Sequence, residues 1–198
     1  MALAAAGAEP TMIVGGQIKN IDSGARLGLG DYLVAEADES DGSFVHLAPL
    51  VAVVTNIDND HLDHHGTMDN LRAAFLAHLS RLPFYGAAVL CADDPELARL
   101  RPALSARVVS YGISRRADWQ ARAIQLGQDG SSYEAFHLGR RAGRIRLRMP
   151  GRHNVLNSLA ALAAGHFLGF PLRGLARGLA AFRGVGRRLD RLGAAGGV

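Results

Sequence analysis

The sequence predicts an α/β fold in which a mostly parallel sheet is flanked by helices and is followed by a small antiparallel β subdomain. Three patterns predict it. In the first half, short apolar runs alternate with amphipathic segments, as in parallel strands joined by helical crossovers. After Gly112, residues alternate in type between glycine-containing turns, as in an antiparallel meander. From Asn154 onward, apolar residues recur with helical spacing.

Each element of the first half has a local signal. Residues 68–82 carry Leu71, Phe75 and Leu79 on one helical face, so this helix is expected to pack on the sheet. Asp94 before Pro95 predicts an N-cap followed by proline in the first turn, and hence a helix over residues 95–100. Apolar runs mark the expected parallel strands, at residues 12–14, 32–37, 51–55, 87–91 and 107–111.

The second half completes one main domain, expected over residues 1–192. Its meander, about residues 118–149, has turns in QDGSS and LGRRAG, and two helices follow it. The glycine- and alanine-rich residues 193–198 are interpreted as a linker to a further domain. The expected strands cover residues 120–126, 132–138 and 144–149, and the expected helices cover residues 154–168 and 172–182.

Composition narrows the class of protein. No apolar run reaches the roughly 18 residues of a membrane span, and residues 1–10 lack the basic flank of a signal peptide, so a cytoplasmic protein without a membrane partner is expected. Cys91 lies in an apolar run and is expected to be a buried thiol. A net charge of +4 would suit nucleic acid. However, the basic residues of 140–148 alternate with small or apolar ones like the outer face of a strand, so no nucleic-acid partner is expected.

Acidic and polar side chains follow two successive predicted strands. The segment EADESD begins with Glu36 at the carboxyl end of one strand, where ligands of parallel sheets collect. The next strand ends in VVTNIDNDHLDHHG, which contains Asn56, Asp60 and His61. The spacing fits neither a zinc finger nor an HExxH helix, so Mg2+ with nucleotide phosphates is the better interpretation. A solvated acidic turn is the alternative for Glu36.

Two further motifs suit a nucleotide. In PGRHNVLN, His153 and Asn157 lie four residues apart and so share a helical face with Asn154. Asparagine amides match the donor and acceptor edge of adenine, and helix capping by Asn154 is the alternative. In GVGRRLD, Arg187 and Arg188 follow a glycine-rich turn and would suit a phosphate, with a surface ion pair to the neighbouring aspartate as the alternative.

Taken in order, six segments resemble the Mur ligase family, and among its branches the one that adds L-alanine. The branch that recycles murein tripeptide is the nearest competitor. Together these segments cover nearly the whole chain. They are IVGGQ, EADESDGSF, VVTNIDNDHLDHHG, LPFYGAAVLCADD, PGRHNVLN and GRRLD.

The resemblance implies a reaction and a division of domains. Members of the L-alanine-adding branch form an amide bond for peptidoglycan synthesis, in which ATP phosphorylates the carboxylate of UDP-N-acetylmuramate and L-alanine attacks the acyl phosphate. This chain corresponds to the central ATP domain of three. It departs from the family because no GKT or GKS phosphate loop occurs in it, so the loop is expected before residue 6 and the last domain after residue 198. The chain alone is therefore expected to be inactive, and a non-catalytic nucleotide-binding module is the alternative.

The resemblance also assigns roles to the candidate residues. Glu36 and His61 match the family's Mg2+ ligands, which are catalytic. Asn56 and Asp60 are assigned to the substrate side. The residues that match the ATP contacts are His153, Asn154 and Asn157 at adenine, and Arg188 with Arg187 at the phosphates.

Overall fold

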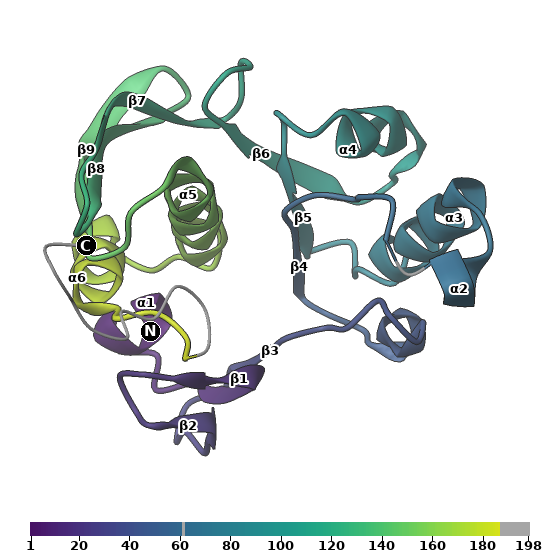
Figure 1. Ribbon diagram of the computed structural model, residues 1–198, viewed down its shortest axis with the longest axis horizontal. Helices are drawn as coiled ribbons and strands as arrows, with labels where there is room; N and C mark the ends of the chain where they lie inside the picture. The colour runs from purple at the N-terminus through teal and green to yellow at the C-terminus, as the bar shows by residue number, and fades with distance from the viewer. Residues whose placement is uncertain (61, 187–198) are drawn as a thin grey trace, which may run out of the picture.

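A six-stranded sheet forms the body of the protein, whose structure, a computed structural model, describes residues 1–60 and 62–186 (Figure 1). The strand order is β4-β5-β6-β7-β8-β9. The first four strands are parallel, and β7, β8 and β9 are antiparallel. The α/β fold with its antiparallel part is thus confirmed. The strands are β4 (Val51–Val54), β5 (Ala87–Cys91), β6 (Arg107–Gly112), β7 (Trp119–Leu126), β8 (Ser131–His137) and β9 (Arg140–Leu147).

The antiparallel meander is joined edge to edge with the parallel strands. Tyr111 and Gly112 of β6 pair with Trp119 and Gln120 of β7, so the two parts share one hydrogen-bonded sheet. The last strand begins at Arg140, four residues before the predicted start. The reason is the turn, which is a two-residue hairpin at Leu138 and Gly139 with φ of 48° and 79°, instead of the longer turn expected in LGRRAG.

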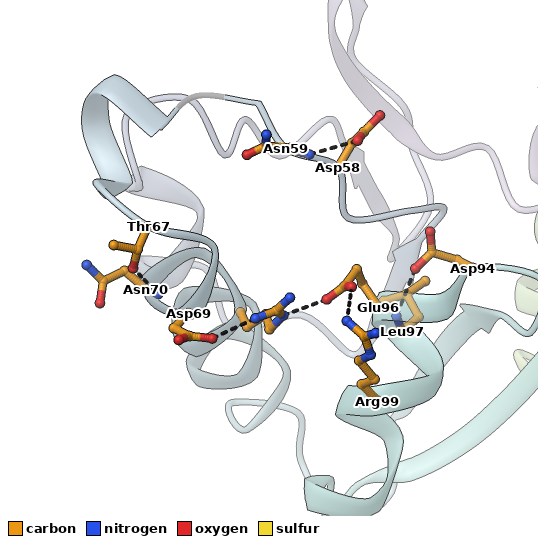
Figure 2. A network of polar contacts seen from close by, with 10 residues as sticks. Asp58, Asn59, Thr67, Asp69, Asn70, Asp94, Glu96, Leu97 and Arg99 are labelled. Atoms are coloured by element: carbon orange, nitrogen blue, oxygen red, sulfur yellow. Dashed lines mark hydrogen bonds and ion pairs between the residues drawn. The ribbon is translucent and has the colours of Figure 1, made fainter.

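Helices cover both faces of the sheet. Figure 1 shows α3 (Met68–Leu79) and α4 (Pro95–Leu100) on the outer side, and α5 (Arg152–Phe167) and α6 (Leu172–Ala181) within the curve of the strands. The predicted N-cap of α4 is confirmed, because the Asp94 carboxylate accepts the Leu97 amide at 2.8 Å (Figure 2). Arg72 of α3 binds Glu96 of α4 at 2.5 Å and so ties the two outer helices together.

A second, three-stranded sheet has the order β2-β1-β3. Its strands are β1 (Thr11–Ile18), β2 (Ser23–Arg26) and β3 (Leu33–Ala35), with β3 parallel and β2 antiparallel to β1. The preceding helix α1 (Ala2–Ala5) packs on α6. Gly178 permits this approach, since a Cβ there would lie 2.7 Å from the Ala2 Cα.

The core lies between α5 and the strands that curve around it. Val155 and Leu159 of α5 are fully buried, as are Tyr111 and Trp119 of the sheet. Cys91 is a buried free thiol, as expected. Within residues 1–60 and 62–186, no helix is both long and apolar enough to cross a membrane.

Candidate functional site

Glu36 follows β3 at the carboxyl edge of the small sheet. Its backbone amide donates to the Ile13 carbonyl at 2.9 Å, and its Oε2 accepts the Gly15 amide at 2.6 Å. The side chain is exposed, and in the described part of the chain no hydrogen bond reaches its Oε1. A backbone amide of β1 therefore orients the carboxylate and leaves one oxygen open to solvent.

The two glycines of IVGGQ have different roles in β1. Gly15 lies against Glu36, since a Cβ there would be 3.4 Å from Oε2. At Gly16 a Cβ would be 2.4 Å from the Val185 Cγ1, so only glycine lets the chain around residue 185 approach. The Gly186 amide then donates to the Gln17 carbonyl at 2.7 Å. Thus β1 positions both Glu36 and the segment that leads to the predicted phosphate-binding arginines.

Arg187 and Arg188 themselves lie outside the described residues, and so does His61. The loops after β3 and β4 meet at Glu39 and His65. His65, in α2 (Leu62–His65), has its Nε2 2.8 Å from the Glu39 carbonyl oxygen. The loop that follows Glu36 is therefore a neighbour of α2, although β3 and β4 belong to different sheets.

The residues that follow β4 form a tight polar turn. Asn56 accepts the Thr55 hydroxyl at 2.9 Å, and the Asp58 carboxylate accepts the Asn59 amide at 2.8 Å (Figure 2). The Asp60 amide donates to the Asp58 carbonyl at 2.8 Å. Asn56 and Asp60 are both exposed, whereas Ile57 between them is buried and anchors the turn. Both candidate substrate residues are thus at the surface.

Several carboxylates and histidines lie near these loops. Among the described residues, no three His, Cys, Asp or Glu side chains form a group that could hold a metal ion. The Ser43 hydroxyl and amide lower the pKa of the Asp41 carboxyl, and His64 contributes to this shift. The Glu36 carboxylate thus belongs to no such group of three among the described residues.

The three residues of α5 that are predicted to contact adenine differ in exposure and in hydrogen bonding. The helix begins at Arg152, and its N-cap is Gly151, with φ of 100° and no side-chain cap. The helix-capping alternative for Asn154 is therefore wrong, because Asn154 lies inside the first turn and donates to the Pro150 carbonyl at 2.7 Å. His153 and Asn157 are exposed on the face that their spacing predicts. No described hydrogen bond or ion pair joins these residues to Glu36.

Sequence reasoning missed Asp93 and the wider role of Asp94. The Asp93 carboxylate accepts backbone amides of the loop after β6, and Asp94 caps α4 beside the end of β4. Burial raises the pKa of Asp94, while the backbone amides of Leu97, Glu96 and Ile57 act in the opposite direction. The ADDP sequence offered the capping signal, but the amides that Asp93 binds lie about twenty residues away and carry no local signal.

Comparison with known proteins identifies the class. The Mur ligase middle domain matches residues 27–165, which is more than half of the chain. The chain therefore belongs to the Mur ligase family.

Individual relatives are more specific. A UDP-N-acetylmuramate–L-alanine ligase of Sorangium cellulosum is 49% identical over 99% of this chain, and one of an Anaeromyxobacter species is 47% identical over the same share. The chain spans 42% and 43% of the lengths of these two relatives.

Solved structures share the fold. The UDP-N-acetylmuramate–alanine ligase of Thermotoga maritima matches with a TM-score of 0.84 and 26% identity, over 98% of this chain and 43% of that one. The UDP-N-acetylmuramate:L-alanyl-gamma-D-glutamyl-meso-diaminopimelate ligase of Neisseria meningitides matches with a TM-score of 0.82 and 28% identity, over 94% of this chain and 61% of that one.

Proposed function

We propose that this chain is the ATP- and Mg2+-binding middle domain of a UDP-N-acetylmuramate–L-alanine ligase. One observation carries the proposal: two adjacent glycines of β1 contact two parts of the candidate site. Gly15 contacts the Glu36 carboxylate, and Gly16 contacts Val185, which precedes Arg187 and Arg188 in the sequence. A metal-binding carboxylate and phosphate-binding arginines at one strand are what phosphoryl transfer requires. The identity to L-alanine-adding relatives supports the substrate assignment.

The proposed reaction joins a carboxylate to an amine in two steps. ATP transfers its γ-phosphate to the carboxylate of UDP-N-acetylmuramate, and the amine of L-alanine displaces phosphate from the acyl phosphate. Bound Mg2+ offsets negative charge on the phosphates. In this scheme Glu36 and His61 hold the metal, Arg187 and Arg188 orient phosphate oxygens, and the polar turn after β4 faces the sugar substrate.

Adenine is assigned to the start of α5. His153, Asn154 and Asn157 share this part of the helix, and Asn157 is exposed without a described hydrogen bond of its side chain. An amide offers one donor and one acceptor, as the edge of adenine requires. Asn154 already gives one of its hydrogens to Pro150, so its oxygen and second hydrogen remain for the base.

Further parts of the site are assigned to the rest of the full-length protein. Parallel strands are normally covered on both faces, yet Leu33 and Val34 of β3 are 61% and 40% exposed, and Val53 of β4 is 45% exposed. In the described sheets, β3 and β4 each pair along one edge only. We assign to this place the strand and the phosphate loop that the family carries ahead of the matched region.

The first experiment changes the metal ligand in the full-length enzyme. Glu36→Gln keeps the shape and the Gly15 hydrogen bond but removes the charge, so alanine-dependent phosphate release is expected to fall by a factor on the order of 100 or more. Asp31→Asn, an acidic residue before the same strand, is the matched control and is expected to retain activity. Near-normal turnover of both Glu36→Gln and His61→Ala at saturating Mg2+ would contradict the metal assignment.

The second experiment separates adenine binding from a structural role. Asn157→Ala removes an exposed side chain from a helix that tolerates alanine, and it is expected to raise the KM for ATP more than that for UDP-N-acetylmuramate. Asn154→Ala is expected to do the same, with an added loss of stability because the Pro150 contact disappears. Equal changes in both KM values would exclude an adenine contact. Replacing L-alanine by murein tripeptide in the same assay tests the competing branch.

The 198-residue chain alone is expected to release no phosphate. A phosphate loop supplies several charge-assisted contacts of about 1.5 to 3 kcal/mol each, and losing three of them weakens ATP binding by roughly a thousandfold or more. Calorimetric titration of ATP into the chain measures this. Micromolar affinity, or alanine-dependent phosphate release, would show that the chain contains the whole site.

A further inference from the structure

A hollow of about 200 Å³ lies between α4 and the outer face of the sheet. Its floor is apolar and includes Leu90, Leu97 and Val108. Figure 1 shows α4 and α5 on opposite sides of β5 and β6, so the hollow is on the other face of the sheet from the proposed adenine residues. It is therefore separate from the candidate site described above.

Three arginines line this hollow. Arg101 follows α4, and Arg115 and Arg116 belong to the loop after β6. All three are exposed, and within the described part of the chain none of their guanidinium groups has a hydrogen-bond or ion-pair partner. Three guanidinium groups without an ion pair, beside an apolar floor, favour an anionic ligand.

Two acidic residues near the hollow have other partners. Glu96 binds Arg72 and Arg99, at 2.5 and 2.6 Å. Asp118 accepts both the amide and the hydroxyl of Ser110, at 2.8 and 2.7 Å. Neither carboxylate forms an ion pair with one of the three arginines, so the guanidinium groups remain free to bind a ligand.

The loop that carries two of the arginines is fixed through its backbone. The Asp93 carboxylate accepts the amides of Ile113, Ser114 and Arg115 at 2.7, 3.0 and 2.8 Å. Gly112 makes this possible, since a Cβ there would lie 3.0 Å from the Asp93 Oδ1. The Arg115 carbonyl also accepts the Gln120 amide group at 3.1 Å. Because the backbone is anchored, a ligand would not have to order the loop.

We propose that this hollow binds a small phosphate monoester, with its dianionic head at the three arginines and an apolar or cyclic body on the floor. A guanidinium group binds two phosphate oxygens at once, like a fork. Three guanidinium groups favour a ligand with two negative charges over a ligand with one. Sites for drug-sized ligands typically occupy about 300–1,000 Å³, so the smaller volume favours a body of one ring over a nucleotide. This inference is independent of the proposed ligase reaction.

The test is a titration of the full chain with phenyl phosphate, followed by amide chemical shifts in NMR spectra. Saturable shifts are expected at residues 97–98 and 114–116. The affinity for phenyl phosphate is expected to be at least about tenfold higher than for two control ligands. Inorganic phosphate lacks the ring, and benzoate carries only one negative charge. Equal affinity for inorganic phosphate, equal affinity for benzoate, or shifts centred elsewhere would each overturn the proposal.

Variants locate the ligand. Arg115→Gln and Arg116→Gln are each expected to weaken phenyl phosphate binding about tenfold. Arg140→Gln, an exposed arginine on the distant β9, is the matched control and is expected to change it less than about twofold. Ala98→Leu on the exposed side of α4 fills the hollow and is expected to abolish binding, with an unchanged thermal midpoint as proof of folding. Equal weakening by Arg140→Gln, or unchanged binding in Ala98→Leu, would refute the site.

Discussion

The hydrogen bond between Tyr133 of β8 and Ser158 of α5 offers a test by double substitution. The destabilising effects of the two substitutions should partly cancel when they are combined. The two hydroxyl oxygens lie 2.9 Å apart, and both residues are buried. The Ser158 hydroxyl donates to the Val155 carbonyl at 2.8 Å, so Tyr133 must donate to Ser158. Burial raises the pKa of Tyr133, which keeps its hydroxyl neutral near pH 7.

The two single variants leave different groups unpaired. Tyr133→Phe removes the bond, but Ser158 keeps its bond to Val155, so the cost is expected to be about 1 kcal/mol. Ser158→Ala leaves the Tyr133 hydroxyl buried without an acceptor, which costs about 1 to 3 kcal/mol. The double variant has no unpaired hydroxyl, and it is therefore expected to be more stable than Ser158→Ala alone.

The free energy of unfolding in urea, followed by circular dichroism at pH 7.5, measures this order. Tyr85→Phe is the control, because Tyr85 is 64% exposed and should not change stability. The coupling between the two sites comes from the double-mutant cycle. If the double variant is less stable than Ser158→Ala by the full cost of Tyr133→Phe, the costs are additive and the reasoning about the unpaired hydroxyl fails.

Three further outcomes are expected. Asp93→Ala removes the acceptor of three backbone amides and should lower the unfolding free energy by about 1 to 3 kcal/mol, whereas an unchanged urea midpoint would contradict this role. Burial and the nearby His166 lower the pKa of His137, so protonation of this ring opposes folding. The free energy of unfolding should therefore fall as the pH drops below about 6.5. In urea titrations from pH 7.5 to 5, His137→Gln should make the free energy of unfolding depend less on pH. Gly165→Ala puts a Cβ 2.5 Å from the Leu175 Cδ2, so its melting temperature should fall despite alanine's helix propensity, and Leu175→Val should restore part of the loss if the clash is the cause.

Elements with a local signal could be predicted from the sequence. The strand of residues 87–91 and the helix of 95–100 were predicted at their observed bounds. The first is a fully buried apolar run, and the second is fixed by Asp94 and Pro95. Such signals depend on neighbouring residues and therefore need no knowledge of the tertiary fold.

Elements that depend on distant partners were missed. The strand Ser23–Arg26 reads SGAR and lacks an apolar alternation, so its pairing with β1 creates it. Likewise α1 packs against α6, whose Gly174 and Gly178 lie near the other end of the chain. The helix α5 begins two residues before the predicted start because Gly151, with positive φ, takes the N-cap position.

In the candidate site, too, some features have a local sequence signal and others depend on distant residues. Glu36 was found because acidic residues at a strand end are conspicuous, yet its orientation by Gly15 involves a residue 21 positions earlier. The need for glycine at position 16 arises from Val185, near the other end of the chain. Local sequence therefore nominates candidate groups, while their geometry depends on contacts that only the fold provides.

Trp119 is the only tryptophan of the sequence, and its place in the fold makes it an optical probe. The indole is 1% exposed and stacks on the His137 ring at a centroid distance of 4.5 Å, with His166 of α5 at 5.3 Å. Emission from an indole so shielded from water is blue-shifted, and a protonated imidazole against its face quenches it. The fluorescence of a single residue thus reports whether the end of α5 is seated on the sheet.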